Sequence, residues 1–130
     1  MNLNETAYIS FYLRVNRIHV FCKTVRTIGE PRFVRFLING DGTSIIMEPY
    51  GKMELQSMRV PKGVYNMSGK MEFRSTPLCQ LLSRRLGWNP MCSYRVPGRI
   101  LAKQGLVLFD LTSAFPIKTD AINTDVEWAQ

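Results

Sequence analysis

The chain has 130 residues, 45% of them hydrophobic and 21% charged, which is typical of one globular domain with its own core. Three cysteines cannot form a complete disulfide set, and no apolar run reaches the length of a membrane span. The formal net charge is +7, but residues 1–118 hold 17 basic and 7 acidic residues, for a formal net charge of +10. A body this basic favours nucleic acid or another polyanion as a partner.

The N-terminal part of the chain is predicted to be mainly strand. Apolar and polar residues alternate strictly over residues 7–15, which predicts a strand with one buried face. The apolar phase then flips, so a turn or bulge is expected at Asn16-Arg17, before further inward residues from Ile18 to Cys22. Residues 23–28 fit either a continued strand or a short helix ending at Gly29, and periodicity alone does not decide between them.

The strongest hairpin signal lies at residues 32–50. Two apolar runs flank the turn sequence NGDG at 39–42, whose residue types favour the positive φ of a tight reversal. Both faces of these runs carry apolar residues, which predicts a central hairpin covered on both sides. Short strands are then expected around residues 58–60 and 64–67.

The clearest single element is a helix over residues 76–86. Ser75 or Thr76 can cap its first turn, and Pro77 suits the first helical position. Gly87 can adopt the left-handed conformation that ends a helix. The leucines at helical spacing form an apolar face, which we expect to pack on a sheet: Leu78, Leu81, Leu82 and Leu86.

After this helix a second hairpin is expected at 94–111, with a bulge at Pro97-Gly98. Residues 119–130 are acidic and without periodicity, so we expect a flexible tail.

The order of these elements indicates a duplicated unit. Residues 17–50 and 70–111 each read as strand, helix ending in Gly, strand, Gly-containing turn and strand. Duplication favours the helix at 23–28, because the second unit has one at the same place. The sequence therefore predicts a single α+β domain over residues 1–118, with a mostly antiparallel sheet and two helices on one of its faces.

One motif resembles a known group of proteins. The motif G-x-P-x-x-V-x-x-L-x-N, closing on an I-x-x-x-P strand, is carried by Gly29, Pro31, Val34, Leu37, Asn39, Ile45 and Pro49. Over residues 17–111 the chain thereby resembles small uncharacterised proteins of Gram-positive bacteria and their mobile elements, a resemblance that implies no activity. The two-unit pattern also resembles the duplicated units of DNA sliding clamps and other pseudo-symmetric DNA binders, which concerns fold and not function.

The residues that could carry chemistry lack a recognisable arrangement. His19 is the only histidine, and no family signature surrounds Cys22, Cys79 or Cys92. These four could supply zinc ligands, but Cys79 and Cys92 are too far apart in sequence to form a close ligand pair. The turn at 39–43 joins two strands and lacks the GK[ST] ending of a phosphate loop. We therefore expect no catalytic activity, no metal, no other cofactor and no small-molecule substrate.

The basic residues are the remaining candidates for a site. Eleven of the 17 are arginine, the residue better suited to bidentate phosphate contacts. Tyrosines and Trp88 are interspersed among them, as on many nucleic-acid-binding surfaces. The predicted contacts are Arg84, Arg85, Arg95, Arg99, Arg59 and Lys62. We therefore expect a non-catalytic nucleic-acid-binding or accessory protein, with DNA and RNA not distinguished.

A protein-interaction module or homodimer is the alternative. Strand 7–15 precedes the first unit and has no partner within it, so its free edge would be available to another chain. No signal peptide is recognisable, because Asn4, Glu5 and Arg14 interrupt the N-terminal segment, and a cytoplasmic location is expected.

Overall fold

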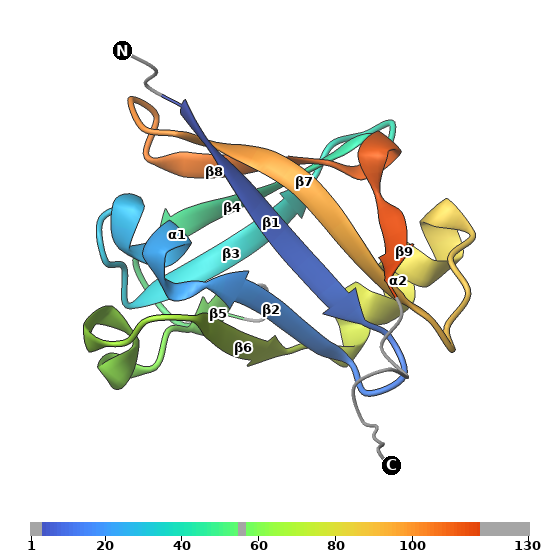
Figure 1. Ribbon diagram of the computed structural model, residues 1–130, viewed down its shortest axis with the longest axis horizontal. Helices are drawn as coiled ribbons and strands as arrows, with labels where there is room; N and C mark the ends of the chain where they lie inside the picture. The colour runs from blue at the N-terminus through green and yellow to red at the C-terminus, as the bar shows by residue number, and fades with distance from the viewer. Residues whose placement is uncertain (1–3, 55–56, 118–130) are drawn as a thin grey trace.

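A single antiparallel sheet of nine strands organises the part of the chain that the structure describes, residues 4–54 and 57–117 (Figure 1). In this computed structural model the strands are β1 (Asn4–Tyr12), β2 (Arg17–Phe21), β3 (Phe33–Ile38), β4 (Ser44–Tyr50), β5 (Ser57–Arg59), β6 (Lys70–Arg74), β7 (Ser93–Leu101), β8 (Leu106–Asp110) and β9 (Phe115–Ile117). The helices are α1 (Cys22–Thr27) and α2 (Thr76–Leu86), with 3₁₀ turns η1 (Lys62–Asn66) and η2 (Leu111–Ser113). The predicted α+β class, with a mostly antiparallel sheet and two helices, is confirmed.

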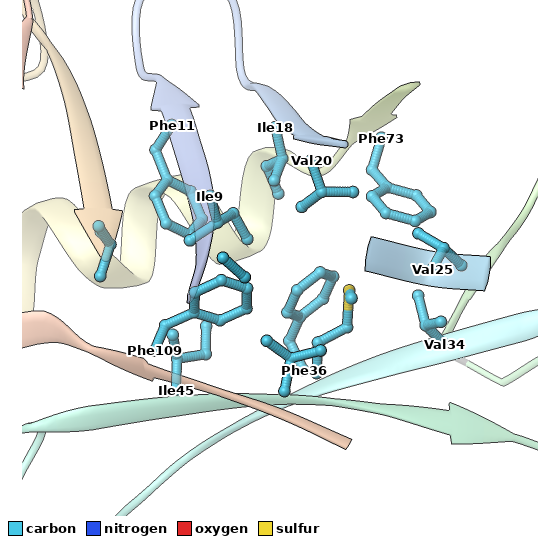
Figure 2. Packing of buried hydrophobic residues seen from close by; sticks show 14 of the residues in the cluster. Ile9, Phe11, Ile18, Val20, Val25, Val34, Phe36, Ile45, Phe73 and Phe109 are labelled. Carbon is cyan, nitrogen blue, oxygen red and sulfur yellow. The ribbon is translucent and has the colours of Figure 1, made fainter. Parts of the chain in front are cut away.

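The sheet curls over, so that its two halves face each other across the core. The strand order is β5-β3-β4-β8-β7-β1-β2-β6, with β9 beside β7. Figure 2 shows Phe11, Ile18 and Phe73 pointing from β1, β2 and β6 toward Phe36 and Phe109 on β3 and β8. The rings of Phe36 and Phe73 meet edge to face at 5.9 Å, which joins the two layers directly.

The two helices lie at opposite ends of the curled sheet (Figure 1), and not on one face as predicted. A curled sheet covers its own inner face and leaves its ends open, so apolar residues are needed at each end. Val25 of α1 and Leu82 of α2, both almost fully buried, fill these places.

α1 resolves the ambiguity at residues 23–28 in favour of a helix. Cys22, Val25 and Ile28 are all buried and recur at three-residue spacing, as one face of a helix requires. Gly29, at φ 105°, then ends the element in a conformation that glycine adopts without strain.

α2 begins and ends as predicted, but its apolar face is narrower. The Ser75 hydroxyl accepts a hydrogen bond from the Leu78 amide at 3.2 Å, and Gly87 has a φ of 68°. Cys79 and Leu82 are buried, whereas the other three leucines of the predicted face are only half-buried: Leu78, Leu81 and Leu86. The helix lies across one end of the sheet and therefore contacts the core along a narrow line. In the described ranges no helix is long and apolar enough to cross a membrane.

Both predicted hairpins form, β3 with β4 and β7 with β8, but neither is covered on both faces. The outward residues of β3 and β4 stay partly exposed, with Arg35 paired to Glu48 and Leu37 open to solvent. The strand expected at 64–67 is instead the 3₁₀ turn η1, which buries only Val64.

No bulge occurs at Pro97-Gly98, because β7 keeps a continuous register with β1 through both residues. A Cβ on Gly98 would lie 2.3 Å from the backbone oxygen of Leu108. Glycine is therefore present to let β8 approach closely. Pro97, which has no N–H, falls between the residues of β7 that pair with β9 and those that pair with β8.

The expected free edge at strand 7–15 does not exist. β1 pairs with β2 on one side and with the whole of β7 on the other, which makes it an interior strand. The unit that follows β1 in sequence supplies only β2 as a partner, whereas β7 lies in the other half of the chain. In the described part of the chain, the sheet ends at β5 and β6. The predicted tail at 119–130 lies outside the described residues.

The pairing pattern relates the two halves of the sheet. Exchanging β1, β2, β3 and β4 with β5, β6, β7 and β8 maps the pairs β2–β6 and β4–β8 onto themselves. It also maps β3–β4 onto β7–β8 and β1–β7 onto β5–β3. Two pairs have no counterpart among the described strands, β1–β2, since β5 and β6 are separated by η1, and β7–β9. Duplication of the unit nevertheless stays a prediction. Similar topology alone does not demonstrate a duplication, because the sequences of the two halves would also have to be related.

Candidate nucleic-acid interface

The six predicted contacts are scattered over the molecule. Lys62 lies on η1 and Arg84 on the last turn of α2, which are on opposite sides of Figure 1. Arg59 on β5 lies over the ring of Phe33 at 5.1 Å, and Arg99 on β7 borders a hollow that also contains Asp110. A single basic edge through all of them is therefore not formed.

Arg85 has a structural contact of its own. Its Nη2 donates to the carbonyl oxygen of Gly40 at 2.7 Å, and its guanidinium lies directly against Gly42. The side chain thus joins the end of α2 to the β3–β4 turn. A residue held in this way has less freedom to contact a ligand than a free arginine on the surface.

Arg95 belongs to a different cluster, on the outward side of β7, β1, β2 and β6. Because side chains alternate along a strand, every second residue of these strands points away from the core. We call this surface the outer face, and it consists of Tyr8, Ser10, Tyr12, Arg17, His19, Phe21, Lys70, Glu72, Arg74 and Arg95.

A polar row crosses all four strands of the outer face. The register aligns Arg95, Ser10, His19 and Glu72 side by side. Arg95 Nε donates to Ser10 Oγ at 3.2 Å, and His19 Nε2 lies 3.0 Å from Glu72 Oε1. The row thus ends in a cation on β7 and in a carboxylate on β6.

Aromatic side chains flank this row. Tyr8 and Phe21 lie on one side and remain 38% and 41% exposed. Tyr12 lies on the other side, with its ring 4.6 Å from that of His19. Phe115 of β9 pairs with Arg95 and is 43% exposed, which places a further aromatic ring beside the face. Four aromatic rings thus lie on or beside one face of the sheet, those of Tyr8, Tyr12, Phe21 and Phe115.

A hollow of about 280 Å³ lies within the outer face. It is lined by Tyr8, Ser10, His19, Val20, Phe21, Lys70 and Arg95. Its lining thus combines two exposed aromatic rings, two cations, a hydroxyl group, an imidazole and a valine. We call it the outer-face groove.

The outer face is positively charged, because it has four basic side chains and, among the described residues, one carboxylate. Glu72 lies 3.3 Å from Arg74 Nε and 3.7 Å from Arg17 Nε, besides its hydrogen bond with His19. The hydrogen bond from His19, followed by that from Arg74, lowers the pKa of Glu72. Among the residues that the structure describes, no carboxylate lies within ion-pair distance of Arg95 or Lys70.

The residues considered for catalysis and for metal binding are separated. His19 lies on the outer face, whereas Cys22 is fully buried in the core. Burial raises the pKa of the Cys79 thiol to about 11, so this side chain is protonated at neutral pH and is a poor nucleophile. Within residues 4–54 and 57–117, no group of three or more histidine, cysteine or acidic side chains could hold a metal ion. The absence of catalytic activity stays a prediction.

Among the groove residues, only Arg95 belongs to the predicted nucleic-acid contacts. The alternation of residues 7–15 already places Tyr8, Ser10 and Tyr12 on one face, and Tyr8 and Tyr12 stand among the basic residues. The missing information was pairing over long distances in sequence, because Ser10 and Arg95 are 85 positions apart. Comparison with family models, curated proteins and solved structures gave no significant match. The groove is therefore interpreted from its geometry and chemistry.

Proposed function

We propose that this protein is a non-catalytic nucleic-acid-binding protein and that its outer face is the binding surface. The observation that carries the proposal is the outer-face groove, in which Arg95 and Lys70, neither of them in an ion pair among the described residues, accompany the exposed rings of Tyr8 and Phe21. Cationic side chains bind phosphates, and aromatic faces stack on bases, so this combination suits both parts of a nucleotide.

The two cations are well separated, which supports a long ligand over a small anion. Arg95 on β7 and Lys70 on β6 are three strand spacings apart, or roughly 14 Å. This is the spacing of the two strands, and the side chains of Arg95 and Lys70 border the same groove from its two sides. A polyanion that crosses the strands would meet one cation on each side of the aromatic rings.

The proposal is tested with two double variants that remove equal charge. Lys70→Ala/Arg95→Ala changes the outer face, and Lys62→Ala/Arg84→Ala changes the exposed cations on η1 and α2. Fluorescence anisotropy at low salt, with DNA and RNA oligonucleotides, gives the dissociation constants. We expect the outer-face variant to lose at least tenfold in affinity and about two phosphate contacts in its salt dependence, and the other variant to lose much less.

The contrary results are distinct. If Lys62→Ala/Arg84→Ala weakens binding more than the outer-face variant, the site lies elsewhere on the surface. If the wild-type protein binds no oligonucleotide even at low salt, the proposal is wrong. Circular dichroism and thermal unfolding of both variants establish that each one retains its fold.

A role in protein interaction or homodimer formation is the second candidate, and it requires an edge other than β1. The structure offers β6, which pairs with β2 on one side and has no strand on its other side among the described residues. An open edge can accept a strand from another chain. Light scattering would detect such a dimer, and a strict monomer at all concentrations would count against this candidate.

A further inference from the structure

We infer that the outer-face groove holds one unstacked base, so that the ligand is a single-stranded nucleic acid and not a duplex. This inference rests on the proposed function and adds to it the class of nucleic acid. It follows from three properties of the groove, namely its size, its lining and the position of its cations.

The size of the groove suits part of a ligand. Its volume of about 280 Å³ is at or below the lower limit of sites that enclose a whole small molecule, roughly 300–1,000 Å³. A planar base that enters from an open strand needs only such a shallow site, since the rest of the strand stays on the surface.

The lining of the groove suits a base in particular. Tyr8 and Phe21 come from adjacent strands and offer partly exposed rings for stacking, with Lys70 Nζ 5.8 Å from the centre of the Phe21 ring. The Ser10 hydroxyl, the His19 imidazole and the Arg95 guanidinium lie in a polar row beside these rings. These groups offer both hydrogen-bond donors and acceptors, which the edge of a base requires. Within the row Arg95 already donates to Ser10 and His19 is hydrogen-bonded to Glu72, so a base would use the remaining donor and acceptor positions of these groups.

The faces of duplex bases are not accessible to such a groove. In a duplex they are stacked on one another, and only their edges are exposed in the major and minor grooves. To contact these edges, a protein needs an element that protrudes into the major or minor groove of the duplex, such as a helix or a two-stranded ribbon. The outer face is the broad surface of a sheet, with its aromatic rings set between cations on β7 and β6. Sheet surfaces with aromatic rings stack on the unpaired bases of single strands.

The test compares three ligands of equal length, about 12 nucleotides, which is within the usual site size for single strands. They are oligothymidylate, a duplex, and an abasic strand that keeps the phosphates but lacks the bases. With fluorescence anisotropy, we expect oligothymidylate to bind at least tenfold more tightly than either of the others. Tyr8→Ala and Phe21→Ala should each weaken oligothymidylate binding roughly 5- to 150-fold, and should leave binding of the abasic strand unchanged.

Two further variants separate stacking from general damage. Tyr8→Trp keeps an aromatic ring at this position and should retain most of the affinity. Met91→Ala removes an exposed apolar side chain outside the groove, one that is 64% exposed, and should have no effect. Since Tyr8 and Phe21 are themselves well exposed, their alanine variants should unfold at nearly the wild-type temperature.

The outcomes distinguish this inference from the proposed function. If the duplex and the abasic strand bind as tightly as oligothymidylate, or if the aromatic variants change nothing, the groove takes no base and the inference is wrong. The proposed function would then still stand on its salt dependence and its cation variants. If none of the three ligands binds, the proposed function itself is wrong.

Discussion

Glu72 reduces the positive charge that four basic side chains give to the outer face. It is the only carboxylate on the outer face, and it lies within 4 Å of Arg17, His19 and Arg74. These contacts fix the position of the Glu72 carboxylate. Its negative charge nevertheless opposes the binding of a polyanion. Its surroundings are largely open to solvent, so each ion pair contributes little to folding.

Glu72→Gln should therefore increase nucleic-acid affinity several-fold at low salt, because it removes the one negative charge from the outer face. Glu54→Gln is the matched control, since it makes the same change in net charge beside Tyr50 and Lys52, away from the outer face. Anisotropy titrations of both variants give the comparison. An equal gain in the two would show that only net charge matters, and not its position on the outer face.

The same substitution has a consequence for stability at low pH. The pKa of Glu72 is lowered in the folded protein, mainly by the hydrogen bond with His19, so folding is favoured above the ordinary carboxyl pKa of about 4.3. This stabilisation is lost as the pH falls below about 4 and through the lowered pKa. Glu72→Gln lacks the titrating group, so its stability should fall less steeply in this range than that of the wild-type protein.

At the scale of elements, local signals in the sequence predict where a helix or turn begins and ends. They predict less well which other segments it packs against or pairs with. The cap at Ser75, the left-handed Gly87 and the turn at 39–42 all act within a few residues, and the structure has each where it was predicted. The partners of β1 and the buried side of α2 were predicted wrongly. The partners of β1 and the buried side of α2 both depend on contacts with segments that are distant in sequence. The periodicity of a single segment carries no information about such contacts.

α2 provides a test of its narrow buried face. Leu82→Ala should lower the free energy of unfolding by about 2–5 kcal/mol, because Leu82 is almost fully buried and its loss leaves a cavity. Leu81→Ala is the control on the neighbouring position, which is half-buried and outside the buried core, and should cost less than about 1 kcal/mol. Urea unfolding measures both values. An equal loss of unfolding free energy in the two variants would contradict the narrow buried face and support the broad leucine face that the sequence predicts.

At the scale of the whole molecule, curling of the sheet determines both the core and the candidate site. Composition and alternation predict a half-buried antiparallel sheet, and this is what the chain forms. They do not predict that the sheet closes over itself, or that β7 brings Arg95 beside β1. The six predicted contacts are therefore scattered in the structure, and the outer-face groove beside Arg95 is formed by strands from both halves of the chain.

Because the sheet is curled, we expect an energetic coupling between two phenylalanines that are far apart along the sheet. Phe36 on β3 and Phe73 on β6 are six strand spacings apart along the sheet, which in a flat sheet would be roughly 29 Å. In the curled sheet their rings lie at 5.9 Å, edge to face. A double-mutant cycle with Phe36→Leu and Phe73→Leu should therefore give a coupling energy of about 0.5–1.5 kcal/mol in urea unfolding.

The control cycle pairs Phe73→Leu with Leu108→Ala, because Leu108 is on the outward side of β8, next to Arg99. Its two changes should be additive to within about 0.5 kcal/mol, as expected for residues that do not touch. Coupling between Phe36 and Phe73 together with additivity in the control requires that β3 and β6 face each other in solution. Additivity in both cycles would mean that the two layers of the sheet do not contact each other. The curved sheet that carries the outer-face groove would then not be formed in solution.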